Sequence, residues 1–265
     1  MEMQSVSVPG IGEPVPVHSA GSGDTVVYLH GVWDQPPNEF LQGLSRTHRV
    51  VAPVHLGFEG APPADTMVDI YDAIYYHLDL LDALGLGEVV LVGHSLGGMF
   101  AAELAAVQPQ RFSRLVLISP FGLWDDAKPV ADFFAMQPAE LSRALYRDLD
   151  SPGAMAVAKA PTDEDELVTY LLKRARAMAT ATRYLWPLPD QGLRRRAHRI
   201  SAPTLVVWGA GDGVAPSAYA QDFATVTRGE AVVVPDAGHL VHLEQRDAVL
   251  EAVQRFLGVA TPARG

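Results

Sequence analysis

Six short runs of aliphatic and β-branched residues constrain the fold of this 265-residue chain more than any other feature. None of these runs alternates with polar residues. A continuous apolar run of this length is typical of a strand that is buried on both faces, as in a parallel sheet covered by helices. The six runs are residues 25–29, 49–53, 88–92, 114–118, 204–208 and 231–234.

Helical patterns lie between these runs. One apolar stripe has the spacing of a helix face, with Asp65 or Thr66 placed to cap its start and Gly85 to end it. Its members are Met67, Ile70, Tyr71, Ile74, Leu78 and Leu81. A second stripe lies within residues 249–257 and stops at Gly258. The alternation predicts right-handed βαβ units, and hence an α/β fold with a mostly parallel, doubly wound sheet flanked by helices.

The strand pattern disappears between about residues 121 and 199. We therefore expect an α/β core made of residues 1–120 and 200–265, with residues 121–199 inserted as a helical cap. Within this segment Thr162 precedes four acids, residues 163–166. A capping hydroxyl followed by acids is typical of a helix N-terminus, and no histidine interleaves the acids to suggest a metal site.

Composition narrows the classes of function. The chain has 48% hydrophobic and 19% charged residues, which excludes disorder and coiled coils as the dominant state. Its 20 basic against 31 acidic residues give a net charge of −11, so we expect no nucleic-acid partner and no insertion into an anionic membrane. No cysteine is present, which removes disulfides, thiolate metal sites and cysteine nucleophiles.

The N-terminal residues 1–23 lack the pattern of a secretory signal, and no stretch of eighteen apolar residues occurs. These absences predict a soluble, cytoplasmic protein. We expect a monomer or a homodimer that needs no cofactor and no metal.

The run at residues 89–92 ends in Gly93-His94-Ser95-Leu96-Gly97, and a helical pattern follows. A serine at such a sharp strand-to-helix turn adopts a positive φ, and glycines two residues to either side relieve the crowding. The hydroxyl is then presented at a helix N-terminus, where developing negative charge is stabilised. Ser95 is therefore the candidate nucleophile.

A serine nucleophile needs a base that is held in place by an acid. Asp212 follows the run at 204–208, and His239 follows the run at 231–234. Because the carboxyl ends of parallel strands meet at one edge of a sheet, both should lie near Ser95. Asp125 remains a rival acid, whereas Asp236 is too close in sequence to His239 for easy approach.

A His-Gly turn follows the first apolar run, at His30-Gly31-Val32-Trp33. A tetrahedral oxyanion needs two donors that are already aimed at it. The backbone amides of Val32 and Leu96 are the predicted pair, and His30 is expected to fix the loop by hydrogen bonds. His94 and His242 are interpreted as packed residues.

Together these motifs resemble those of the α/β-hydrolase superfamily over nearly the whole chain. The resemblance implies the α/β-hydrolase fold, with Ser95 as nucleophile, His239 as base and Asp212 as orienting acid. One loop departs from the pattern: residues 54–60 replace the Asp-x-x-Gly-x-Gly of many relatives, and here His55 resembles a His-Pro-Gly-Phe variant in which Leu56 replaces the proline.

Acyl transfer is the chemistry that a serine at this position supports. The leading hypothesis is a carboxylic ester hydrolase (a carboxylesterase) that acts on small to medium, largely apolar esters. The alternative is a carbon–carbon bond hydrolase of vinylogous diketo acids, with an arginine such as Arg174, Arg176 or Arg183 binding the substrate carboxylate; Leu240, where such enzymes usually show tryptophan, weakens it. A receptor-like binding protein with a residual triad is the third hypothesis. The predicted substrate-binding residues are Trp33, His30, Trp124, Phe134 and Trp186.

Overall fold

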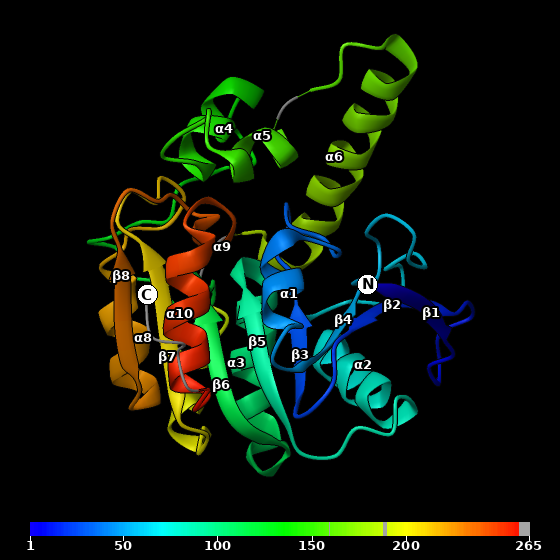
Figure 1. The fold of residues 1–265 in the computed structure, drawn as a ribbon, viewed down its shortest axis with the longest axis vertical. Coiled ribbons are helices and arrows are strands. Elements are labelled where there is room, and N and C mark those ends of the chain that lie inside the picture. Colours follow the sequence, from blue (N-terminus) through cyan, green and yellow to red (C-terminus); the bar gives the residue numbers. More distant parts are fainter. Residues whose placement is uncertain (159, 188–189, 260–265) are drawn as a thin grey trace.

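An eight-stranded sheet runs through the middle of the molecule, in a computed structural model that describes residues 1–158, 160–187 and 190–259 (Figure 1). The order of its strands is β1-β2-β4-β3-β5-β6-β7-β8. The bounds are β1 Glu2–Val6, β2 Val15–Ala20, β3 Thr25–Leu29, β4 Arg49–Pro53, β5 Val89–His94, β6 Phe112–Ile118, β7 Thr204–Gly209 and β8 Glu230–Val234. Residues 159, 188 and 189 of the expected cap lie outside the described residues.

Strands β3 to β8 pair in parallel, and they are the six strands that the apolar runs predict. The chain also forms β1 and β2, which the sequence did not predict. Strand β2 is antiparallel to both β1 and β4. Four of the five β1 residues are exposed, so this edge strand has no continuous apolar run. The mostly parallel sheet is as expected, with an antiparallel edge in addition.

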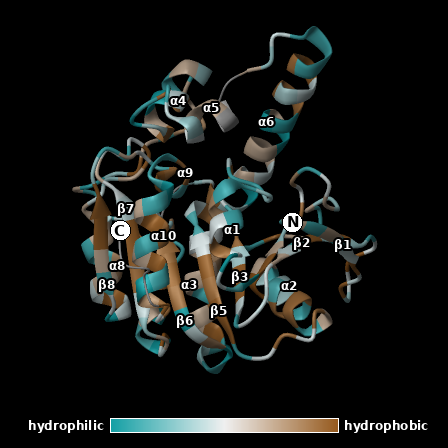
Figure 2. Ribbon diagram, in the orientation of Figure 1, coloured by the Kyte–Doolittle hydropathy of each residue, from teal (hydrophilic) through white to brown (hydrophobic). Residues whose placement is uncertain are grey.

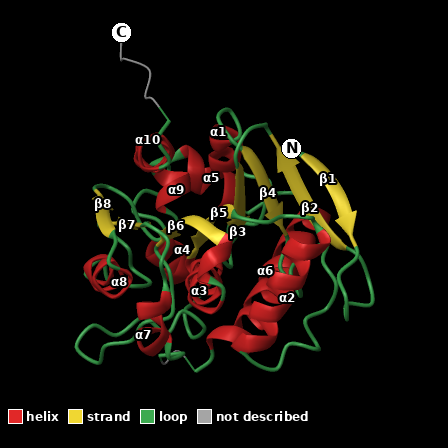
Figure 3. Cartoon of the chain, turned by 90° about the horizontal axis from the view of Figure 1, so that it is seen from below, coloured by secondary structure: helices red, strands yellow, loops and turns green. Residues whose placement is uncertain are grey.

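Helices cover both faces of the sheet (Figure 3). Helices α1 and α10 lie on one face, and α2, α3 and α8 lie on the other. Their bounds are α1 Glu39–Leu44, α2 Ile70–Ala83, α3 Ser95–Val107, α8 Tyr219–Thr227 and α10 Arg246–Phe256. Shorter elements are α9 Val241–Glu244 and two 3₁₀ turns, η1 Pro109–Arg111 and η2 Ala197–Arg199. Figure 2 shows that the central strands are hydrophobic, as a sheet buried on both faces requires.

The segment between β6 and β7 contains helices and no strand among its described residues. Its helices are α4 Pro138–Leu145, α5 Pro152–Ala158, α6 Glu164–Leu185 and α7 Leu193–Arg196. Helices α4, α5 and α6 lie beyond the carboxyl ends of the strands (Figure 1). No helix of the described chain combines the length and the hydropathy needed to span a lipid bilayer.

Two predicted helix starts are wrong by a few residues. Helix α2 is capped by Asp69 rather than by Asp65 or Thr66, because Asp69 and Asp72 form a reciprocal capping box. Helix α6 is capped by Asp163 rather than by Thr162, because the carboxylate of Asp163 accepts two backbone N–H groups of the first turn. The capping group is a carboxylate in both helices, and its negative charge also interacts favourably with the positive end of the helix dipole.

A partly buried ion pair connects α7 to the core. The guanidinium of Arg196 donates to both carboxylate oxygens of Glu103, at 2.7 and 2.6 Å. Glu103 lies on α3 and is fully buried. Bidentate pairing of this kind fixes orientation as well as distance, so it holds the end of the β6–β7 segment against the helix that begins at Ser95.

Candidate active site

Ser95 lies at the turn between β5 and α3, and its φ is +54°. This is the strained backbone that the motif predicts. A Cβ at Gly97 would stand 2.1 Å from the Leu29 carbonyl oxygen, and one at Gly93 would stand 2.3 Å from the Gly97 oxygen. Both positions therefore require glycine, and this requirement explains the spacing of the motif.

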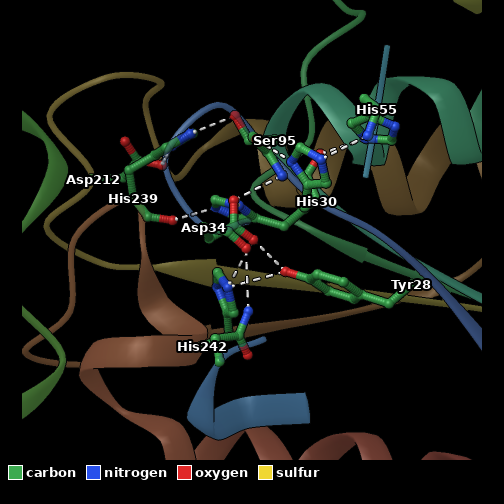
Figure 4. A network of polar contacts seen from close by, with 11 residues as sticks. Tyr28, His30, Asp34, His55, Ser95, Asp212, His239 and His242 are labelled. Atoms are coloured by element: carbon green, nitrogen blue, oxygen red, sulfur yellow. Dashed lines mark hydrogen bonds and ion pairs between the residues drawn. The ribbon is translucent and has the colours of Figure 1, made fainter. Parts of the chain in front are cut away.

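The structure brings Ser95, His239 and Asp212 together from three strand ends (Figure 4). The Ser95 Oγ lies 2.9 Å from His239 Nε2, and His239 Nδ1 lies 2.8 Å from Asp212 Oδ2. Ser95 and His239 are fully buried. This order of hydroxyl, imidazole and carboxylate is that of a catalytic triad.

Backbone amides fix the carboxylate of Asp212. Its Oδ1 accepts N–H groups from Val214 at 2.8 Å and from Ala215 at 2.9 Å. Because these contacts occupy one oxygen, the other oxygen is left to accept the Nδ1 hydrogen of His239. The Nε2 atom then carries a lone pair that faces Ser95.

The rival acids have other contacts. The Asp125 carboxylate pairs with Lys128 at 3.4 Å and accepts the Ala127 amide, and Asp236 is exposed. Within the described part of the chain, Asp212 is the carboxylate that hydrogen-bonds His239.

The His-Gly turn after β3 lies beside Ser95. We call residues 30–34 the oxyanion loop, after the role that the sequence predicts for it. His30 is fully buried, its Nδ1 donates to the Gly31 carbonyl, and its Nε2 accepts the His55 amide. Burial lowers the pKa of His30 to about 4, so the ring is neutral at pH 7. The Val32 amide donates to no acceptor in the described chain, and Leu96 lies in the first turn of α3, where amides have no partner within the helix.

A second polar group, which sequence reasoning missed, lies under this loop. The carboxylate of Asp34 is buried and contacts His94, His242 and Tyr28 (Figure 4). His94 and His242 were interpreted as packed residues, and both are buried, but each also makes hydrogen bonds. The one available signal was an acid placed three residues after Gly31. Ligand atoms of Asp34, His94 and His242 all lie within 4.8 Å of one another, a grouping that could hold a metal ion.

Aromatic rings cover His239. The ring centroid of Phe121 lies 5.5 Å from that of His239, and the centroid of Trp33 lies 6.0 Å from it. Phe133 packs against both Trp33 and Phe121. Phe121 and Phe133 belong to the β6–β7 segment, so this segment packs over His239.

A pocket of about 270 Å³ opens beside the oxyanion loop. Val32 and Trp33 form one wall, and Tyr170, Lys173 and Arg174 of α6 contribute to another. Its lining therefore combines apolar surface with two cations, of which Lys173 pairs with Glu59 at 2.8 Å.

The predicted substrate-binding residues are dispersed. Trp33 lines the pocket, whereas His30 is fully buried and does not line it. Trp124 donates its ring N–H to Asp126, at 2.7 Å. Phe134 packs against Trp186, which is 55% exposed. Trp33 alone of the five lines this pocket.

Comparison with known proteins shows similarity in sequence and similarity in fold. A family model described as the alpha/beta hydrolase family matches residues 26–252. The chain is 29% identical over 253 residues to the sn-1-specific diacylglycerol lipase ABHD11 of Mus musculus, covering 88% of this chain and 80% of that protein.

A second relative is matched only over part of its length. The chain is 28% identical over 246 residues to the dihydrolipoyllysine-residue acetyltransferase component of the acetoin cleaving system of Pseudomonas putida. The match covers 89% of this chain but 64% of that protein, so the chain spans less than two thirds of its length.

A solved structure of a meta-cleavage product hydrolase from Pseudomonas fluorescens IP01 superposes with a TM-score of 0.77. The match is at 21% identity, and it covers 97% of this chain and 98% of that one. At this identity the likeness is one of fold.

Proposed function

Because the chain belongs to the alpha/beta hydrolase family, we propose that it hydrolyses carboxylic esters through an acyl-enzyme on Ser95. The predicted α/β-hydrolase fold is confirmed by the match and the superposition. One observation carries the proposal: the unbroken chain of contacts from Ser95 Oγ through His239 to Asp212.

The proposed reaction uses this chain of contacts as follows. His239 Nε2 takes the proton of Ser95 as the hydroxyl attacks the ester carbonyl, and Asp212 stabilises the imidazolium that forms. The amides of Val32 and Leu96 donate to the oxyanion. His239 then gives the proton to the leaving alcohol, and water, activated by the same histidine, releases the acid.

The surroundings of Ser95 support small to medium, largely apolar substrates. Phe121, Phe133 and Trp33 supply apolar surface around His239, and we propose that a substrate displaces part of this cover to reach Ser95. The similarity to a diacylglycerol lipase supports an ester as the substrate.

A carbon–carbon bond hydrolase is the second candidate, because one of the three arginines suggested for it lies in the pocket. Arg174 lines the pocket beside Trp33. Arg176 donates instead to the carbonyls of Gly57 and Ala61, and Arg183 pairs with Asp65. Turnover of a vinylogous diketo acid well above that of any simple ester would favour this candidate. The intact triad geometry weighs against a receptor with no activity.

The test is hydrolysis of p-nitrophenyl esters of graded acyl length by purified protein. Replacing Ser95 with alanine should lower turnover by a factor on the order of a million. Ser119→Ala is the matched control. Ser119 also follows a strand, is buried and has a positive φ, but its hydroxyl has no hydrogen-bond partner among the described residues. Equal turnover by the Ser95 variant and the wild type would refute the proposal.

A further inference from the structure

The carboxylate of Asp34 lies beneath the oxyanion loop with no exposure of its side chain. Its Oδ1 accepts the Gly31 amide at 2.7 Å and faces His94 Nδ1 at 2.9 Å. Its Oδ2 accepts the Tyr28 hydroxyl and faces His242 Nε2 at 3.2 Å (Figure 4). Four groups therefore converge on one carboxylate, two on each oxygen.

Several donors on one carboxylate favour its charged form. Burial alone would raise the pKa of Asp34, but the charge of His94 and the hydrogen bonds from His242 and His94 outweigh it and hold the pKa well below its usual value. The contacts independently fit an Asp34 anion that only accepts hydrogen bonds, since the Gly31 amide donates to one oxygen and the Tyr28 hydroxyl to the other.

His94 meets an acceptor at each ring nitrogen. Its Nδ1 faces the Asp34 carboxylate, and its Nε2 lies 3.1 Å from the backbone carbonyl of His239. Neither an ionised carboxylate nor a carbonyl can donate, so both contacts need a hydrogen on the ring. An imidazole that donates from both nitrogens is an imidazolium cation.

A cationic His94 would lie close to two other histidine rings, and it therefore needs an anion beside it. His242 and His239 lie 4.3 and 5.2 Å from His94 between ring centroids. Burial and the charge of His94 lower the pKa of His242 to about 4, so His242 stays neutral and donates from Nε2. The anion that neutralises the cationic His94 in this enclosed space is Asp34.

We infer that Asp34 and His94 form a buried ion pair that positions both the oxyanion loop and the catalytic histidine. Asp34 holds the amide of Gly31, the residue before the oxyanion donor Val32, and His94 holds the backbone of His239. Both are positioning residues, since neither touches the reacting atoms. The inference deepens the proposed function and rests on it for its effect on turnover.

A metal ion held by the same residues would be a different arrangement. A histidine that binds a metal almost always donates its other ring nitrogen to a partner. His242 Nδ1 is buried and has no partner in the described chain, while both Asp34 oxygens already accept hydrogen bonds. The contacts therefore favour an ion pair.

Asp34→Asn tests the inference with little change in shape. The amide oxygen of the new side chain can still accept from Gly31, but the negative charge is gone. His94 then keeps one hydrogen, which it can donate to the new side chain or to His239 but not to both. The loosened backbone should lower kcat for an ester by about 100-fold, with KM unchanged.

Tyr28→Phe is the matched control. It removes a buried donor from the same carboxylate but leaves the contacts of Asp34 with Gly31 and His94 in place. We expect this variant to keep the kcat of the wild type. Equal losses of kcat in the two variants would show that the cluster acts only through general stability, and would overturn the inference.

Nitrogen NMR of ¹⁵N-histidine-labelled protein at pH 8, without substrate, reads the ion pair directly. We expect hydrogen on both ring nitrogens of His94 in the wild type and in Tyr28→Phe, and on one in Asp34→Asn. A single hydrogen in the wild type, or a metal that copurifies with the protein and is lost in Asp34→Asn, would contradict the inference. The wild-type spectrum tests the ion pair even if Asp34→Asn does not fold or the wild type cleaves no ester. A wild type that cleaves no ester would count against the proposed function alone.

Discussion

Replacing Asp212 with asparagine should disable the base without disturbing the fold. The Val214 and Ala215 amides both donate to Oδ1 of Asp212. An asparagine must therefore place its carbonyl oxygen there and turn its NH₂ group toward His239. An NH₂ group donates, so Nδ1 of His239 must accept, and the hydrogen of the ring moves to Nε2, the atom that faces Ser95.

A ring that carries its hydrogen on Nε2 cannot take the serine proton. In serine hydrolases with this arrangement, the wrong tautomer lowers kcat by about 10⁴-fold. This factor corresponds to about 5 kcal/mol of activation free energy. The variant keeps the two backbone hydrogen bonds, so its melting temperature should match that of the wild type.

The assay is steady-state hydrolysis of p-nitrophenyl butyrate, with thermal unfolding measured on the same preparations. Asp236→Asn is the control, since Asp236 is an exposed acid near His239 in sequence and its φ of +53° is one that asparagine tolerates. The reasoning is refuted if Asp212→Asn keeps more than about a tenth of the wild-type kcat. It also fails if the loss of activity follows a loss of folded protein.

Two further predictions concern the elbow and the oxyanion loop. Gly97→Ala places a Cβ 2.1 Å from a backbone oxygen, so it should lower the free energy of unfolding in urea by about 3 kcal/mol. Gly87→Ala is the control, because a Cβ there meets no atom within 4 Å, and equal stabilities of the two variants would contradict the packing argument. The pKa of His30 is lowered to about 4 in the folded state, so the unfolded chain binds more protons between pH 4 and 6.5 and stability falls as the pH falls through that range. Unfolding free energies at pH 7 and pH 5 should show a pH dependence about 2 kcal/mol smaller in His30→Asn than in the wild type, and an unchanged dependence would be the contrary result.

The sheet could be predicted from the sequence where burial is uniform. The strands from β3 to β8 lie within two residues of the apolar runs. The inner strands are buried and leave a local signal, whereas β8, the other edge strand, keeps its apolar run although only Val234 of its five residues is buried. The antiparallel edge leaves no such signal in the sequence, because β1 is mostly exposed and β2 contains Pro16. The pairing of these two strands depends on neighbours distant in sequence. Helix starts were misplaced where several acids compete for the cap, as at Asp69.

The candidate site was also predictable in part. Ser95, Asp212 and His239 each follow a predicted strand, and parallel topology brings strand ends to one edge. The network around Asp34 was not predictable, since its members come from a strand, a loop, the elbow and α9, and their contacts depend on side-chain packing.

The central claim is tested most directly by trapping the covalent intermediate. Wild-type protein is mixed with p-nitrophenyl butyrate and quenched in acid during turnover, and its peptides are sequenced by mass spectrometry. We predict a butyryl group on Ser95, absent from Ser95→Ala. Ester consumption with no acylated peptide, or with the acyl group on another residue, would contradict the account.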